Sequence, residues 1–176
     1  MTSLVLSDIE DACRKISIEL IKETGLAYRK TEKGLWATSI LRDVYEAFKW
    51  ACLEKYKHFV DLGSGDGRVV ALASLFTRAS GIEIDPVLHM ASEKLKDFLE
   101  LENVQFHLGD FEKWDLNEFD FIYMYPDRAV IRIGNQLEDT WEGTIMIAGS
   151  HFEPSNLIKV AQVKFSIERF VLYKKS

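Results

Sequence analysis

The chain has 176 residues, of which 22 are Lys or Arg and 28 are Asp or Glu, so its formal net charge is −6. Apolar residues make up 47% of the sequence, which is enough for one well-packed core, and the length predicts one domain with a terminal extension. The acidic balance argues against a protein that holds duplex nucleic acid on a basic face, whereas lysine-rich proteins stay open as partners.

Other features argue against export, membrane insertion and metal binding. Asp8, Glu10 and Asp11 stand where a signal peptide needs basic and then apolar residues. The longest uncharged run, residues 143–152, has ten residues, about half of a membrane span. The two cysteines form no CxxC pattern, and the four histidines show no ligand spacing. We therefore expect a cytoplasmic protein without a metal site.

Hydrophobic periodicity predicts two N-terminal helices. Apolar residues at helical spacing indicate one helix in the first 25 residues, with a capping-box pattern at Ser7 and Glu10 and a stop at Gly25. A second helix is expected over residues 39–56. We interpret residues 1–57 as a helical extension that serves as a lid, with packing against the sheet or a dimer contact as alternatives.

From residue 58 onward, short apolar runs alternate with helical patterns. Strands are expected at residues 58–62, 81–84, 104–108, 119–125 and 144–148, and helices at residues 67–77, 86–101 and 129–141. The tail, residues 157–173, predicts two antiparallel strands. This alternation indicates an α/β domain over residues 58–176, with a mostly parallel sheet that is covered on both faces.

Residues 59–68, Phe-Val-Asp-Leu-Gly-Ser-Gly-Asp-Gly-Arg, predict a strand, a tight turn and a helix, the context in which such a turn binds a nucleotide-like ligand. A dinucleotide fingerprint needs a third glycine where Arg68 stands, and it would bring a pyrophosphate beside Asp61 and Asp66. Two carboxylates repel a pyrophosphate. They suit S-adenosyl-L-methionine, which has no phosphate and carries an ammonium and a sulfonium. A Walker loop is excluded because no Gly-Lys-Ser/Thr follows.

Two later positions support an adenosine-containing ligand. Glu83 ends the next expected strand, 22 residues after Asp61, where its carboxylate would accept both ribose hydroxyls. Asp110 and Phe111 follow the third expected strand, where they would meet the adenine amino group and ring. The alternatives are a plain tight turn at the glycines, a surface charge at Glu83 and a helix cap at Asp110.

These motifs resemble those of class I S-adenosylmethionine-dependent methyltransferases over about residues 58–150. The resemblance implies a Rossmann-like seven-stranded sheet, mostly parallel with an antiparallel final strand and with helices on both faces, which binds S-adenosyl-L-methionine at the carboxyl ends of its first strands. It assigns cofactor binding to Asp61, Gly63, Ser64, Gly65, Asp66, Gly67, Glu83, Ile84, Asp85, Asp110 and Phe111.

Residues 60–68 and 81–86, with residues 143–144 and 150–152, are also similar to the archaeal and mitochondrial protein-lysine methyltransferases. This narrower resemblance implies a protein lysine as the methyl acceptor. The Tyr-x-Pro-Thr-like element of that family would align with residues 35–39, which contain Trp36 and Thr38 but lack the proline. Residues 122–127 lack the Asn/Asp-Pro-Pro-Tyr of enzymes that methylate base amino groups, which argues further against nucleic acid.

Methyl transfer is an in-line displacement, so the protein mainly aligns nucleophile, methyl group and sulfur. We expect Trp36, Thr38 and Tyr125 to line the substrate channel. Tyr125, the backbone near Pro126 and the Asp127 carboxylate would orient the accepting nitrogen. The alternative for the tyrosines at 123 and 125 is that they are ordinary strand residues, one in the core and one outside.

Two other functions remain open from the sequence. A small-molecule methyltransferase would share every cofactor residue, and a non-catalytic binding module would keep only the fold. The intact Asp61, Gly63, Gly65 and Glu83 argue against the module, because a domain without a cofactor has no physical need for that turn.

Overall fold

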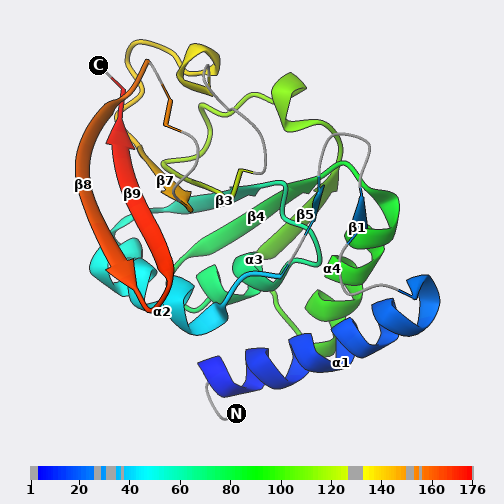
Figure 1. The fold of residues 1–176 in the computed structure, drawn as a ribbon. Coiled ribbons are helices and arrows are strands. Elements are labelled where there is room, and N and C mark those ends of the chain that lie inside the picture. The colour runs from blue at the N-terminus through cyan, green and yellow to red at the C-terminus, as the bar shows by residue number, and fades with distance from the viewer. Residues whose placement is uncertain are drawn as a thin grey trace.

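A computed structural model describes residues 4–25, 29–30, 35–36, 38–126, 133–149, 153–154 and 156–175 of the chain. Their main feature is a seven-stranded sheet with the strand order β5-β4-β3-β6-β7-β9-β8 (Figure 1). Its strands are β3 (His58–Leu62), β4 (Arg78–Glu83), β5 (Val104–Leu108), β6 (Phe121–Met124), β7 (Thr144–Ala148), β8 (Ile158–Phe165) and β9 (Glu168–Lys174).

The pairing directions confirm the expected Rossmann-like sheet. Strands β3 to β7 are parallel to one another, and β9 is antiparallel to both β7 and β8. The C-terminal tail forms the expected pair of strands, a long curved hairpin at the sheet edge (Figure 1). Strand β4 begins three residues earlier than expected, because Arg78, Ala79 and Ser80 pair with the start of β3 although they form no apolar run.

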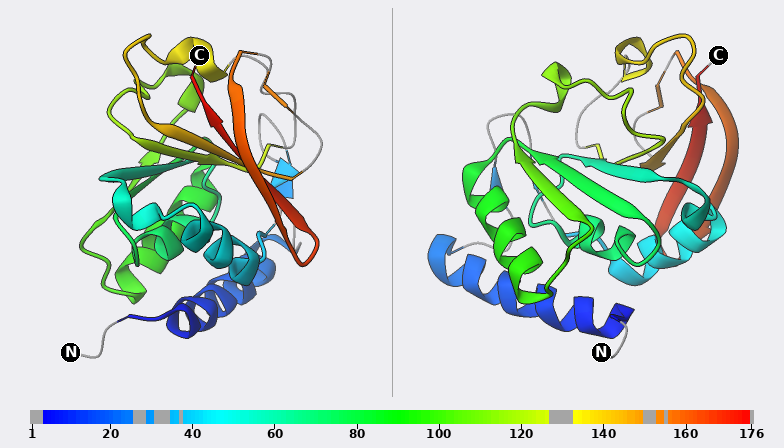
Figure 2. Two further views of the ribbon diagram at one scale, coloured as in Figure 1. Left: turned by 90° about the vertical axis from the view of Figure 1, so that its left-hand side faces the viewer. Right: turned by 180° about the vertical axis from the view of Figure 1, so that it is seen from behind.

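Four α-helices cover one face of the sheet (Figures 1 and 2). They are α1 (Leu6–Thr24), α2 (Leu41–Trp50), α3 (Arg68–Ala73) and α4 (Pro86–Phe98). Helix α1 lies outermost and packs on α3 and α4. At the centre of this layer, the Phe48 ring of α2 lies edge-on to the rings of Phe59, Phe121 and Tyr123. None of the described helices is both long and apolar enough to cross a membrane.

The second face is covered by the 3₁₀ helices η2 (Phe111–Lys113) and η3 (Ile133–Gln136) and by the segments beside them. The helix expected at residues 129–141 is wrong in its described part, where only η3 is helical; residues 127–132 lie outside the described residues. Long-range bonds hold this segment instead. The Glu138 amide donates to Asn117 Oδ1 at 2.8 Å, and Trp141 Nε1 donates to the Phe119 carbonyl at 2.7 Å.

The N-terminal helices also differ in detail from expectation. Helix α1 begins at Leu6, where the Asp8 carboxylate accepts from the Val5 amide at 3.0 Å, so the Ser7–Glu10 capping box is wrong. Helix α2 ends at Trp50 and is followed by the 3₁₀ helix η1 (Leu53–Lys55), because Cys52 adopts a φ of +53°. Between α1 and α2 lies a short hairpin of β1 (Arg29–Lys30) and β2 (Leu35–Trp36), which the periodicity did not indicate.

The central ring of Phe48 gives a test of the helical layer. Phe48→Ala should lower the free energy of unfolding by about 3–5 kcal/mol, because it leaves a cavity among the facing rings. Urea denaturation measures the change. The matched control is Ile167→Ala at an exposed turn position, which should change the free energy by less than about 0.5 kcal/mol. Equal effects of the two variants would contradict this description of the core.

Candidate active site

The carboxyl ends of the parallel strands meet at one edge of the sheet. Backbone hydrogen bonds join the turns that follow β3, β4 and β5. Gly63 N and Ser64 N donate to the Ile82 carbonyl at 2.9 and 3.1 Å, and Gly109 N donates to the Glu83 carbonyl at 2.8 Å. The glycine turn, Glu83 and the segment around residues 109–111 are therefore neighbours, as a single adenosine-sized ligand requires.

The glycine turn needs its glycines for two reasons. Gly63, Gly65 and Gly67 have φ angles of +81°, +56° and +81°, a region that favours glycine. At Gly67, where α3 begins, a Cβ would lie 2.6 Å from Phe106 Cζ and 2.7 Å from Ser92 Cβ. The start of α3 therefore packs closely on β5 and α4, and a side chain at position 67 would displace the turn from the edge of the sheet.

Glu83 holds the glycine turn. Its side chain is almost completely buried, and its two oxygens accept from Gly65 N at 2.8 Å and from Asp85 N at 2.7 Å. Burial raises the pKa of this carboxyl, while the backbone hydrogen bonds oppose that shift. Each carboxylate oxygen keeps a further lone pair, so the group can accept from a ligand as well. The structure gives Glu83 a place next to the turn and excludes the alternative of a solvated surface charge.

Asp61 is the most strongly perturbed carboxyl of the site. It is 4% exposed at the end of β3, and burial, followed by the charges of Glu83 and Asp66, raises its pKa well above the usual value. Among the described residues, no Lys or Arg pairs with it. A cation placed beside Asp61 would offset the repulsion among the three carboxylates, so the arrangement favours a positively charged ligand.

Asp66 has a different environment from the one that the sequence suggested. Its carboxylate is buried and accepts from Arg68 Nε at 3.0 Å and from Arg68 Nη2. The same Nη2 donates to Ser17 Oγ of α1 at 2.9 Å. Asp66 thus has a cationic partner already, and the pair ties the glycine turn to α1. Arg68 and Ser17 also line a shallow cavity of about 450 Å³ between α1 and the start of α2.

Three of the remaining predicted residues have local structural roles. Asp85 caps α4, where its side chain accepts from the amides of Val87 at 2.9 Å and Leu88 at 3.1 Å. Asp110 caps η2 through the Glu112 amide at 3.1 Å, which is the alternative considered for it above. Phe111 packs against the apolar cluster on the second face. All three follow the carboxyl ends of β4 or β5, and Ile84 is half-buried between Glu83 and Asp85.

Tyr125, which the sequence predicts to lie on the acceptor side, stands at the same edge of the sheet, directly after β6. Asp61 and Tyr123 are paired positions of β3 and β6, so Tyr125 continues the strand to the level of Gly63. Tyr123 is buried and Tyr125 is 46% exposed; strand alternation would put both on one face, and they differ because Tyr125 lies beyond the end of β6. The Tyr125 hydroxyl donates to Glu168 Oε1 at 3.0 Å, and burial together with Glu168 raises the pKa of Tyr125 to about 12.

Glu168 is the residue that sequence reasoning missed. It begins β9, and the antiparallel register that pairs Ala148 with Phe170 brings it to the carboxyl end of β7. No local signal marks it, because its position depends on pairing across the sheet. Gly149, with φ +89°, lies between the two partners: a Cβ there would be 3.4 Å from Tyr125 Cε1.

The other residues that the sequence predicts to contact the methyl acceptor are described only in part. Asp127 lies outside the described residues, as do residues 150–152 of the lysine-methyltransferase resemblance. Trp36 belongs to β2, and only its backbone is described. Thr38 is exposed in the segment before α2, and Pro126 is half-buried after Tyr125. The structure therefore brings Tyr125 and Pro126 to the edge of the glycine turn and leaves the channel role of Trp36 and Thr38 as a prediction.

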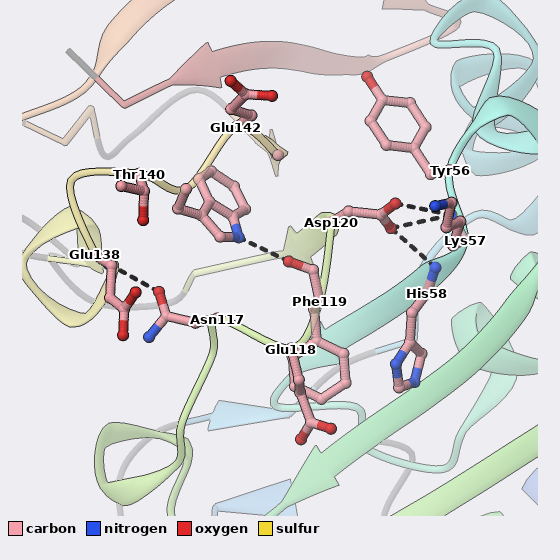
Figure 3. A pocket seen from close by; sticks show the side chains of 12 residues that line it. Tyr56, Lys57, His58, Asn117, Glu118, Phe119, Asp120, Glu138, Thr140 and Glu142 are labelled. Carbon is pink, nitrogen blue, oxygen red and sulfur yellow. Dashed lines mark hydrogen bonds between the residues drawn. The ribbon is translucent and has the colours of Figure 1, made fainter.

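A separate cavity of about 570 Å³ lies at the opposite, amino ends of β3, β6 and β7 (Figure 3). Its Asp120 carboxylate accepts from the backbone amides of Lys57 and His58, and the Trp141 indole bonds to the Phe119 carbonyl beside it. None of the predicted cofactor residues lines it. Within the described ranges, no three His, Cys, Asp or Glu side chains are arranged to hold a metal ion.

No protein-family model matches the chain, and no curated protein does. Its fold is shared with solved methyltransferase structures. An RNA methyltransferase from Salinibacter ruber in complex with S-adenosyl-L-homocysteine is 23% identical, with a TM-score of 0.62 over 75% of this chain and 89% of that chain. A variant of the protein MtNAS in complex with S-adenosylmethionine is 20% identical, with a TM-score of 0.58 over 75% of this chain and 62% of that one.

The mitomycin 7-O-methyltransferase MmcR is 14% identical, with a TM-score of 0.60 over 77% of this chain and 54% of that chain. This chain therefore spans little more than half the length of that protein. The three likenesses establish the Rossmann-like methyltransferase fold and its seven-stranded sheet. They do not support the narrower similarity to protein-lysine methyltransferases, which rests on the sequence segments alone.

The buried charge of Asp61 predicts a specific pH dependence. A carboxyl whose pKa is raised by folding binds more protons in the folded state, so the free energy of unfolding falls as the pH rises from its unfolded pKa through its raised folded pKa. Asp61→Asn removes this titrating group. Between pH 5 and pH 8, the free energy of unfolding of the cofactor-free variant should therefore fall less than that of the wild type. Urea denaturation at both values measures it. Asp97→Asn, an exposed control, should keep the wild-type pH slope, and an unchanged slope in Asp61→Asn would contradict the interpretation.

Proposed function

We propose that the protein is an S-adenosyl-L-methionine-dependent methyltransferase that transfers a methyl group to an acceptor nitrogen. The observation that carries the proposal is the buried carboxylate of Asp61 beside the glycine turn, which no described Lys or Arg pairs with and which lies close to the second buried carboxylate, Glu83. This environment repels phosphate and suits a cationic ligand. The fold-sharing structures that contain S-adenosyl-L-homocysteine and S-adenosylmethionine support the choice of cofactor.

The residues present fit this cofactor. The methionine part would lie over Gly63, Ser64 and Gly65 with its cationic groups toward Asp61, and Glu83 would accept the ribose hydroxyls. Ile84, Asp110 and Phe111 would border the adenine. Gly67, Asp66 and Asp85 act indirectly, because Gly67 gives α3 its close start, Asp66 fixes the turn through Arg68, and Asp85 caps α4. When bound, the cofactor supplies a methyl group that its sulfonium already activates.

The chain itself orients the accepting nitrogen. Tyr125 and the backbone at Pro126 stand level with the glycine turn, and we assign them, with Asp127, to the acceptor side. Trp36 and Thr38 would line the outer part of the channel through which the acceptor enters. The nitrogen must be neutral to attack, and a partly buried site disfavours its ammonium form. We keep residues 1–57 as an N-terminal extension with a lid role, an interpretation consistent with the link from Ser17 through Arg68 to the glycine turn.

A protein lysine is the acceptor that we favour, in a cytoplasmic protein, because residues 60–68 and 81–86 resemble the lysine methyltransferases. The acidic net charge of −6 suits a basic protein partner and disfavours extended nucleic acid. A small-molecule acceptor is the second candidate, supported by the shared fold of the mitomycin 7-O-methyltransferase. An RNA acceptor has the support of the Salinibacter ruber enzyme only.

Cofactor binding is tested by calorimetry with S-adenosyl-L-methionine and S-adenosyl-L-homocysteine. Glu83→Gln should weaken both affinities about 10- to 100-fold, since a hydrogen bond to a charged group contributes about 1.5–3 kcal/mol. Urea denaturation of the same variant shows whether it is folded at the temperature used. Glu102→Gln, an exposed control, should bind as the wild type does. An absence of binding to the wild type at millimolar cofactor would overturn the proposed function.

The acceptor class is tested with methyl-labelled cofactor and a cell extract that is separated into protein, RNA and small-molecule fractions. We expect the label in protein, recovered as methyl-lysine after hydrolysis. Label confined to small molecules or to RNA would reject the lysine acceptor and keep the methyltransferase. Wild-type protein that binds the cofactor but labels no fraction would support the non-catalytic binding module.

A further inference from the structure

The hydrogen bond between Tyr125 and Glu168 fixes an aromatic ring at the acceptor side of the site. Tyr125 follows β6, and Glu168 begins β9. The 3.0 Å bond between the Tyr125 hydroxyl and Glu168 Oε1 therefore crosses the end of β7, which lies between these strands. The Tyr125 side chain reaches across the end of β7 toward β9, and 46% of the residue stays exposed to solvent. The pair is therefore placed to contact an acceptor.

Gly149 lies beside the Tyr125 ring. It follows β7 with a φ of +89°, and its amide continues the ladder by donating to the Arg169 carbonyl at 2.9 Å. A Cβ at this position would stand 3.4 to 3.7 Å from Cε1, Cζ and Oη of Tyr125. These are ordinary van der Waals distances, so the ring lies close to Gly149, and its hydroxyl bonds directly to Glu168.

The pair offers hydrogen-bond acceptors and no free donor. A phenol has one hydrogen, and the Tyr125 hydrogen is used on Glu168, so its oxygen has only lone pairs left for the substrate. The pKa of about 12 keeps that hydrogen in place at ordinary pH. The carboxylate of Glu168 lies beside the Tyr125 oxygen and would repel an anionic oxygen or sulfur nucleophile, whereas a neutral amine can donate an N–H to that oxygen while its own lone pair attacks.

We propose that Glu168 is a positioning residue that holds Tyr125 as a hydrogen-bond acceptor and thereby selects a neutral primary or secondary amine as the methyl acceptor. This inference rests on the proposed function. In the transfer, the nitrogen lone pair forms the N–C bond, the C–S bond breaks with its electron pair going to sulfur, and the new ammonium loses its proton to water. A tertiary amine has no N–H for Tyr125, so transfer to it is disfavoured and methylation stops at the dimethyl product.

The test uses the full chain, methyl-labelled S-adenosyl-L-methionine and three probe acceptors: butylamine, N-methylbutylamine and N,N-dimethylbutylamine. Their kcat/KM values are compared at equal concentrations of the neutral amine. The wild type should favour butylamine over the tertiary amine by about tenfold or more. Tyr125→Phe should bring the ratio to within about twofold and lower kcat for butylamine. Glu168→Ala should do the same with an unchanged KM for the cofactor, and Glu168→Gln should lie between wild type and alanine.

A matched control lies next to the pair. Glu153→Gln alters the carboxylate that bonds Arg169 at 3.2 Å but does not contact Tyr125, so it should keep the wild-type ratio. If Glu168→Ala lowers transfer to all three amines equally, Glu168 is merely structural and the proposal is overturned. It is also overturned if the wild type methylates none of the probes or does not distinguish among them. The calorimetry and the labelled extract fractions decide the proposed function separately.

Discussion

The carboxylate of Glu83 bonds two backbone amides that belong to different turns, and the architecture of the site depends on this interaction. Gly65 N comes from the turn after β3, and Asp85 N comes from the turn that starts α4. One buried charged group therefore sets the distance between the two strand ends. Because burial of a carboxylate is costly unless its oxygens are hydrogen-bonded, the two amides and the ionised form of Glu83 stabilise each other.

The negative charge of the site is unevenly compensated. Arg68 balances Asp66, whereas Asp61 is buried without a cation among the described residues. Folding thus leaves one carboxylate in an unfavourable environment, and a cationic ligand is the natural compensation. A buried carboxylate of this kind lowers the stability of the empty protein and would be complementary to a cationic ligand, a pattern that is common where pKa values are strongly perturbed.

Local patterns in the sequence predicted the sheet and the glycine turn well, because buried strands and positive-φ glycines have local causes. The closeness of the Asp61 and Glu83 carboxylates could be predicted from the same patterns, since these residues lie at the ends of adjacent parallel strands. Features fixed by distant partners could not be predicted. The segment around Trp141 is held by Phe119 rather than by its own helix, and Glu168 reaches Tyr125 only through the antiparallel register of β9. Arg68 stands two residues after Asp66 in the sequence, but the sequence alone did not predict that the two side chains form an ion pair.

The bond from Arg68 to Ser17 connects the outermost helix to the glycine turn, although α1 contributes none of the predicted cofactor residues. Through this bond, Ser17 on α1 and Asp66 in the glycine turn share one guanidinium. The docking of α1 and the ordering of the turn are then linked equilibria, and thermodynamic reciprocity requires that each stabilises the other by the same free energy. A ligand that ordered the glycine turn would therefore also stabilise the docking of α1, on the outer side of the helical layer.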